Sequence, residues 1–111
     1  MFELEGKCAL ITGASGGIGV SIARALYAQG AKVALSGTRI DPLKALADDL
    51  GDRAFIVPCN LSDVDAVKAL PQTATEEMGG IDILVNNAGI TKDNLLMRMS
   101  DDDWHQVINV N

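Results

Sequence analysis

One stretch indicates the fold of this chain: Thr12-Gly13-Ala14-Ser15-Gly16-Gly17-Ile18-Gly19. The apolar run 7–12 ends in it, and the segment 17–29, with apolar residues at helical spacing, begins in it. Glycines between a strand and a helix permit close approach of a ligand, and the free N–H groups and dipole of the helix N-terminus attract phosphate. We expect this stretch to bind a pyrophosphate, with Gly13 allowing the turn, Gly17 the approach of phosphate, and Gly19 tight packing of helix on strand.

The rest of the chain alternates short apolar runs with longer amphipathic segments, which is typical of repeated βαβ units. Handedness rules for parallel crossovers then give a sheet in the order 3-2-1-4. The predicted fold class is α/β, a partial, doubly wound parallel sheet of the Rossmann type. The predicted strands are 7–12, 32–36, 54–59 and 81–86, and the predicted helices are 17–29, a segment from Asp41 to Leu50, a segment after Ser62, and 100–111.

Three features predict where helices begin or break. Asp41 and Pro42 suit the N-cap and first turn of the second helix. Ser62 with Asp65 resembles a capping box for the third helix. Pro71 falls inside that helix and should kink or split it.

The last part of the chain is predicted as a loop over 87–99 and a helix that Ser100 caps. Trp104, Val107 and Ile108 would form its apolar stripe, and Asn111 continues that stripe seven residues after Trp104. His105 lies off the stripe. The outer edge of the fourth strand would then have no neighbouring strand.

Composition narrows the function. The chain has 111 residues, 48% of them hydrophobic and 4% aromatic, which fits one domain whose strands are buried under helices. A net charge of -6 argues against a nucleic-acid partner and against an anionic membrane surface. Cys8 and Cys59 lie in apolar runs and are interpreted as small buried side chains, so no metal site is expected. The acidic N-terminus is unlike a signal peptide, which favours a cytoplasmic protein.

Two motifs carry a resemblance to a known family. Thr-Gly-x-x-x-Gly-x-Gly at 12–19 and Asn86-Asn87-Ala88-Gly89 after the fourth predicted strand resemble the hallmarks of the short-chain dehydrogenase/reductase family. Both motifs lie at carboxyl ends of strands, where open α/β sheets bind ligands. The resemblance implies a dinucleotide site that includes both motifs, and it places Asn60 and Leu61 near the adenine ring.

The end of the second strand bears on the cofactor. An NAD enzyme usually has an acidic residue there for the ribose hydroxyl, whereas this chain has Ser36-Gly37-Thr38-Arg39. Arg39, beside Thr38, can pair with a 2′-phosphate. Many NADP-preferring relatives carry a basic residue where this chain has Gly16. We expect the cofactor to be NADP(H). The alternative is that Arg39 is a solvated loop residue without a role in cofactor binding.

Residues 89–99 narrow the resemblance to 3-oxoacyl-[acyl-carrier-protein] reductases. This implies NADPH-dependent reduction of 3-oxoacyl thioesters in fatty acid biosynthesis, with acyl carrier protein as partner and a homotetrameric assembly. It also implies that Asn111 belongs to a catalytic tetrad whose Ser, Tyr and Lys lie outside these residues. Residues 1–111 would be the NADP-binding portion of a single-domain reductase and inactive alone. The alternatives are a non-catalytic dinucleotide-binding fragment and a dehydrogenase for a sugar or steroid.

Overall fold

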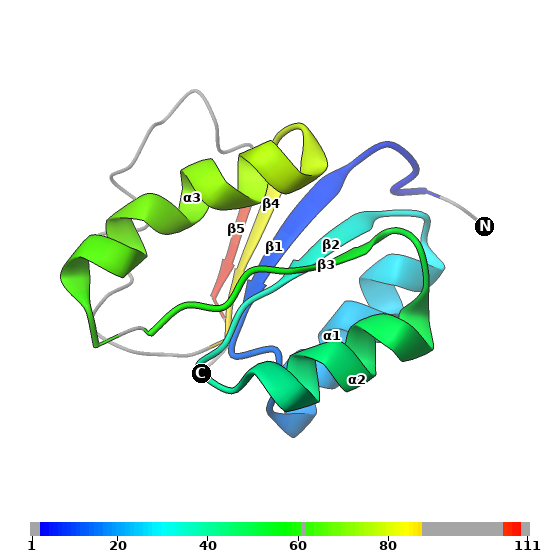
Figure 1. Ribbon diagram of the computed structural model, residues 1–111. Helices are drawn as coiled ribbons and strands as arrows, with labels where there is room; N and C mark the ends of the chain where they lie inside the picture. The colour runs from blue at the N-terminus through cyan, green and yellow to red at the C-terminus, as the bar shows by residue number, and fades with distance from the viewer. Residues whose placement is uncertain (1–2, 61, 88–105, 110–111) are drawn as a thin grey trace.

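The computed structural model describes residues 3–60, 62–87 and 106–109 (Figure 1). They form one parallel sheet in the order β3-β2-β1-β4-β5. The predicted Rossmann-type order 3-2-1-4 is confirmed, and a fifth strand extends it. The strands are β1 Cys8–Thr12, β2 Lys32–Leu35, β3 Ala54–Ile56, β4 Ile83–Asn86 and β5 Gln106–Asn109; the helices are α1 Gly17–Ala28, α2 Ile40–Leu50 and α3 Val64–Met78.

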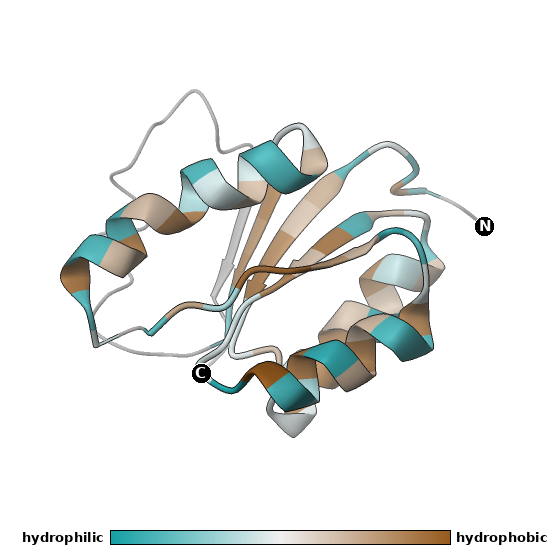
Figure 2. Ribbon diagram, in the orientation of Figure 1, coloured by the Kyte–Doolittle hydropathy of each residue, from teal (hydrophilic) through white to brown (hydrophobic). Residues whose placement is uncertain are grey.

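Helices α1 and α2 cover one face of the sheet and α3 covers the other (Figure 1). The two faces follow from the alternation of side chains along each strand. On β1, Ala9 and Ile11 pack toward α1 and α2, whereas Cys8 and Leu10 pack toward α3. Figure 2 shows mostly hydrophobic residues along β1, β3 and β4. A sheet buried on both faces explains why these strands are continuous apolar runs.

The register of the strands aligns their carboxyl ends. Ile11 of β1 lies beside Leu35 of β2, and Thr12 lies beside Asn86 of β4. Three helices begin at this same end of the sheet, because each helix runs back antiparallel to the strands. The glycine stretch, the end of β2 and the end of β4 therefore come together at the carboxyl end of the sheet.

Two predicted N-caps are wrong by one or two residues. Helix α2 begins at Ile40, so Arg39 rather than Asp41 is its N-cap, and no side chain caps it. Asp63 rather than Ser62 caps α3, and its Oδ1 accepts hydrogen bonds from the backbone N–H of Asp65 at 3.0 Å and of Ala66 at 3.3 Å. A carboxylate directly before the first turn reaches two free N–H groups, which Ser62, one residue earlier, does not.

Pro71 does not split α3, which is a single helix from Val64 to Met78. Proline removes one hydrogen bond from a helix interior. Leu70, Pro71 and Ala74 are buried, so packing on the sheet holds the helix across that gap.

The predicted final helix is wrong over 106–109, where the chain forms β5 instead. This strand pairs in parallel with β4, from Ile83 beside Gln106 to Asn86 beside Asn109. Valine and isoleucine favour strands over helices, and the open edge of β4 offers a full row of backbone partners. The edge of β4 is thus covered. The loop over 88–99, Ser100 and Trp104 lie outside the described residues.

Candidate functional site

The glycine stretch forms a tight turn at the carboxyl end of β1. Gly13 has a φ of +65°, in the left-handed region that glycine favours. Its carbonyl oxygen accepts a hydrogen bond from the N–H of Gly16 at 3.2 Å, which closes the turn. The N–H of Ala14 donates to the carbonyl of Ser36 at 3.0 Å and ties the turn to the end of β2. The loop is therefore fixed by backbone contacts.

Several backbone donors of this loop have no acceptor in the part of the chain that the structure describes. Among them are the N–H groups of Ser15, Gly17 and Ile18, at or before the first turn of α1. Gly16 is the N-cap of α1 and supplies no side chain to satisfy them. A β-carbon added to Gly17 would meet no atom within 4 Å. Free donors beside open space are what an anion at a helix N-terminus requires.

Gly19 packs α1 against the end of β1 more tightly than any side chain would allow. A β-carbon there would lie 2.2 Å from the carbonyl oxygen of Gly13, and 2.9 Å from both the Cα of Ala14 and the Nδ2 of Asn87. The packing predicted for Gly19 is therefore present. Any larger residue would displace the turn that the free N–H groups depend on.

The two asparagines that follow β4 differ in their surroundings. Asn86 is buried. The Oγ1 hydroxyl of Thr12 donates to the Oδ1 of Asn86 at 3.2 Å and lies 3.3 Å from the carbonyl oxygen of Val85. Asn87 is half-buried, and its Nδ2 donates to the carbonyl oxygen of Gly13 at 3.0 Å. Asn86 thus joins β1 to β4, whereas Asn87 reaches the glycine turn itself.

Buried polar side chains among the described residues gather at one end of the sheet. They are Thr12, Ser36 and Asn86, each at the carboxyl end of its strand or one residue beyond. The Oγ of Ser36 has no hydrogen-bond partner within the described chain. Buried polar groups normally have a hydrogen-bond partner, and an exception needs an explanation. The carboxyl end of the sheet thus differs chemically from the apolar interior of the sheet.

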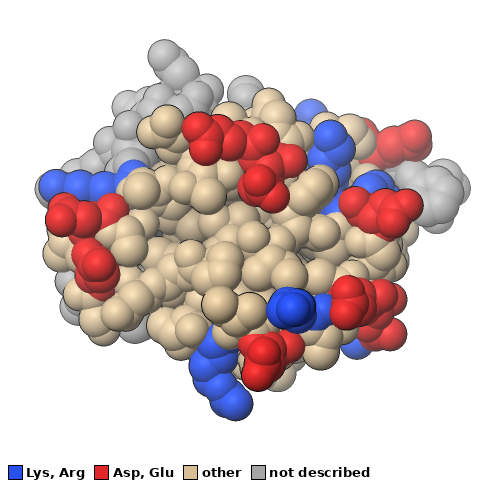
Figure 3. Space-filling view, viewed as in Figure 1, with Lys and Arg blue, Asp and Glu red and all other residues tan. Residues whose placement is uncertain are grey.

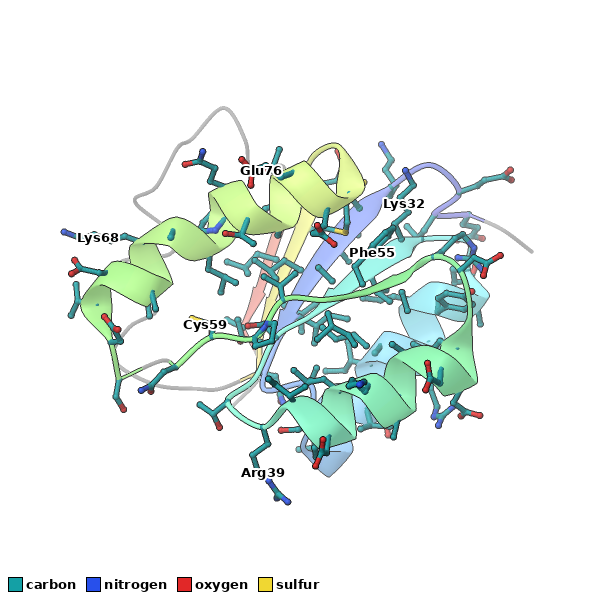
Figure 4. All side chains as sticks on the ribbon, viewed as in Figure 1. Lys32, Arg39, Phe55, Cys59, Lys68 and Glu76 are labelled. Atoms are coloured by element: carbon teal, nitrogen blue, oxygen red, sulfur yellow. The ribbon has the colours of Figure 1, made fainter. Side chains whose placement is uncertain are left out.

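The end of β2 opens into a pocket of about 350 Å³ lined by residues 38–42. Thr38 and Arg39, which the sequence analysis placed in the cofactor site, both line this pocket. The Arg39 side chain is exposed and points away from the helices (Figure 4). Within the described residues it forms no ion pair or hydrogen bond. On the face shown in Figure 3, cations are interspersed with acids and form no continuous basic patch.

The sequence analysis missed an apolar rim around the carboxyl end of the sheet. Ile18, Ile40 and Val64 are 57%, 51% and 40% exposed, and each lies at the first or second position of a helix. These side chains are thus largely exposed within the described part of the chain.

The remaining predicted site residues are only partly described. Asn60 is exposed, and its Oδ1 accepts from the N–H of Ser62 at 3.0 Å, so its side chain shapes the turn before α3. Leu61, Ala88, Gly89 and Asn111 lie outside the described residues. No helix in the described part is long and apolar enough to cross a membrane.

The cysteines are buried on the α3 face of the sheet. Burial raises the pKa of the Cys8 thiol, with a further increase from Asp82 and an opposing effect of Lys32. Burial, and then Asp63, raises the pKa of the Cys59 thiol. Both are thus poor nucleophiles at neutral pH. The described residues contain no group of three or more His, Cys, Asp or Glu side chains that could bind a metal.

The family resemblance rested on the glycine motif and on the Asn-Asn pair. The structure places the glycine motif between a strand and a helix, with the Asn-Asn pair beside it. Residues 7–111 match the short chain dehydrogenase family. The chain belongs to this family.

Among curated members of the short-chain dehydrogenase family, the chain is 62% identical over 111 residues to Nodulation protein G of Rhizobium sp. (strain N33). It is 50% identical over 109 residues to the 3-oxoacyl-[acyl-carrier-protein] reductase FabG of Vibrio harveyi. These alignments cover 100% and 98% of this chain but 45% of each relative. The chain therefore spans about half the length of the curated relatives it matches.

A solved structure agrees with this assignment. The 3-ketoacyl-(acyl-carrier-protein) reductase from Brucella melitensis, complexed with NADH, superposes with a TM-score of 0.74 at 41% identity. The match covers 79% of this chain and 36% of that one. The family and the fold thus rest on sequence and on structure.

Proposed function

We propose that the carboxyl end of the sheet binds a nicotinamide dinucleotide, with the pyrophosphate on the glycine turn. The observation that carries this proposal is that the N–H groups of Ser15, Gly17 and Ile18 have no acceptor among the described residues and lie beside open space at the N-terminus of α1. They can donate to phosphate oxygens without disturbing a hydrogen bond that already exists. The Brucella melitensis relative was solved with NADH, which supports the same class of ligand here.

We propose further that NADP(H) is preferred, through Arg39. The pocket at 38–42 begins where an NAD enzyme would place a carboxylate for the ribose hydroxyl, and this chain has Thr38 and Arg39 there instead. The guanidinium has no partner in the described chain and can pair with the 2′-phosphate through two hydrogen bonds. No side chain caps the N-terminus of α2, and the partial positive charge of the helix dipole there favours binding of the negatively charged phosphate. Ile40 offers an apolar surface for the adenine ring.

Binding of NADPH and NADH to the Arg39→Ala variant tests the cofactor proposal. Loss of a charge-assisted pair should weaken NADPH binding roughly tenfold to a hundredfold and leave NADH binding unchanged. Isothermal titration calorimetry measures both dissociation constants. Lys44→Ala is the matched control, since Lys44 is an exposed cation one turn into α2. An equal loss for both cofactors, or an equal effect of Lys44→Ala, would contradict the role of Arg39.

For the whole protein we propose reduction of 3-oxoacyl-[acyl-carrier-protein] to the 3-hydroxyacyl product. Support comes from the 50% identity to the Vibrio harveyi reductase and from the 62% identity to Nodulation protein G. Bound NADPH would supply a hydride to the C3 carbonyl carbon, and a proton on the oxygen completes the hydroxyl group. The residues described here bind and orient the dinucleotide. Asn111 is proposed to assist proton transfer, with a Ser, a Tyr and a Lys that the family resemblance places outside residues 1–111.

This proposal predicts that the 111-residue polypeptide binds NADPH but does not oxidise it with an acetoacetyl thioester. Its single tyrosine, Tyr27, is far from the site at the opposite end of α1. NADPH oxidation by this polypeptide would contradict the assignment of the missing residues. The same assay on a longer protein containing this chain, with 3-oxoacyl thioesters, steroids and sugars in parallel, distinguishes the acyl-carrier-protein substrate from the alternatives. Acyl carrier protein as partner and a homotetramer are part of the same proposal.

A further inference from the structure

The Gly13 carbonyl oxygen is the point at which the parts of the site meet. It accepts from the N–H of Gly16 at 3.2 Å and from the Nδ2 of Asn87 at 3.0 Å. The Cα of Gly19 packs so closely against it that a β-carbon would come within 2.2 Å. A carbonyl oxygen accepts two hydrogen bonds, so both of its acceptor positions are filled. The orientation of this peptide group is thus fixed from three directions.

Two of these three contacts come from the loop and its own helix, whereas Asn87 comes from the end of β4. Gly13, Gly16 and Gly19 lie within seven residues of each other, so the contacts among them are local. Asn87 is 74 residues away in sequence and is anchored by Asn86, which is buried beside Thr12. Of the three contacts on this oxygen, the Asn87 amide is the one that comes from another strand, and it joins the turn to β4 as the Ala14 N–H joins it to the end of β2.

We propose that Asn87 is a positioning residue, which holds the glycine turn in the conformation that presents the N–H groups of Ser15, Gly17 and Ile18 to pyrophosphate. This inference rests on the proposed dinucleotide site and changes the role expected for Asn87. The side-chain amide is committed to Gly13 and acts on the cofactor through the turn. Without it, the free chain samples other turn conformations, and binding must restore the ordered one at a cost in affinity.

The effect should depend on which part of the ligand touches the turn. NADPH carries the pyrophosphate, whereas adenosine 2′-monophosphate carries the adenine, the ribose and the 2′-phosphate without it. Loss of one neutral hydrogen bond corresponds to roughly a three- to tenfold change in affinity. Asn87→Ala should therefore weaken NADPH binding by about that factor and leave binding of adenosine 2′-monophosphate unchanged.

The experiment compares the wild-type chain with Asn87→Ala and with Gln72→Ala, which removes an amide from an exposed position on α3. Titrations give the affinity for both ligands, and amide hydrogen exchange in the ligand-free chain reports the turn directly. We expect faster exchange at Gly16 in Asn87→Ala, weaker NADPH binding, and no change in Gln72→Ala. A melting temperature for each variant shows whether the fold is intact.

Unchanged NADPH affinity together with unchanged exchange at Gly16 would overturn the inference. Equal losses for NADPH and adenosine 2′-monophosphate, with a lower melting temperature, would also overturn it, because Asn87 would then support the fold in general. A wild-type chain that binds neither ligand would instead refute the proposed function, and the exchange of Gly16 would still show whether Asn87 holds the turn.

Discussion

The two ends of the sheet use their polar groups in opposite ways. At the amino end, the N–H of Cys8 donates to the Oδ2 of Asp82 at 2.9 Å, and the N–H of Asp82 donates back to the carbonyl oxygen of Cys8 at 2.8 Å. The Nζ of Lys32 donates to the carbonyl oxygen of Met78, the last residue of α3, at 3.2 Å. Figure 4 shows Lys32 and Arg39 at opposite ends of the molecule. Arg39 has no such partner in the described chain.

Arg53 shows how completely the amino end is occupied. Its guanidinium lies 3.8 Å from the centre of the Tyr27 ring and donates to the carbonyl oxygens of Tyr27 at 3.1 Å and Ala31 at 2.5 Å. A cation at the C-terminus of α1 is also favoured by the helix dipole. Both ends are rich in polar groups. Within the described residues, those named at the amino end are paired, whereas the carboxyl end has backbone donors and a cation without a partner. This difference indicates which end stabilises the fold and which end binds a ligand.

Gly19→Ala should break the carboxyl end most severely. The added β-carbon would lie 2.2 Å from the Gly13 carbonyl oxygen, so the turn must move. We expect no detectable NADPH binding and a loss of roughly 1–3 kcal/mol in the free energy of unfolding, measured by urea denaturation. Gly80→Ala is the control, since a β-carbon at Gly80 would meet no atom within 4 Å. Normal NADPH binding by Gly19→Ala would contradict the packing described for this turn.

Arg53→Ala should break only the amino end. Loss of the ring contact and of the two hydrogen bonds to carbonyls should lower the free energy of unfolding by about 1–2 kcal/mol. NADPH affinity should stay within about twofold of the wild-type value, because α1 remains folded at its other end. Arg24→Ala is the matched control: its ion pair with Asp49 is half exposed, with side chains 50% and 58% accessible, and should contribute about 0.5 kcal/mol or less. An Arg53→Ala variant that keeps full stability but loses NADPH binding would reverse the comparison.

The buried thiols should produce the smallest effect, visible only in alkaline solution. Burial raises the pKa of Cys8 and of Cys59, so the unfolded chain releases these protons at a lower pH than the folded chain does. Stability is unaffected below the ordinary thiol pKa of about 8.5 and falls as the pH rises above it. Urea denaturation at pH 8 and pH 10 should show a larger loss for the wild type than for the double variant Cys8→Ala and Cys59→Ala. Equal losses would show that the thiols are not responsible.

The fold and the position of the glycine turn were predictable from the sequence because both depend on local signals. The glycines mark the turn between β1 and α1, and the apolar runs mark four of the strands within a few residues. Sequence reasoning failed at residues 106–109, where strand formation depends on the open edge of β4, a partner distant in sequence. It also gave no indication that the Asn87 amide contacts Gly13, or that Ile40 is exposed beside Arg39. Those facts follow from how separate segments pack.

The central claim is that the carboxyl end of the sheet, and not the amino end, binds the dinucleotide. Titration of the isotopically labelled 111-residue chain with NADPH, followed by backbone amide resonances, tests it most directly. We expect saturable shifts at Ser15, Gly17, Ile18 and Arg39, with no shifts at Cys8, Arg53 and Asp82. The absence of saturable shifts, or shifts centred on the amino end, would contradict it.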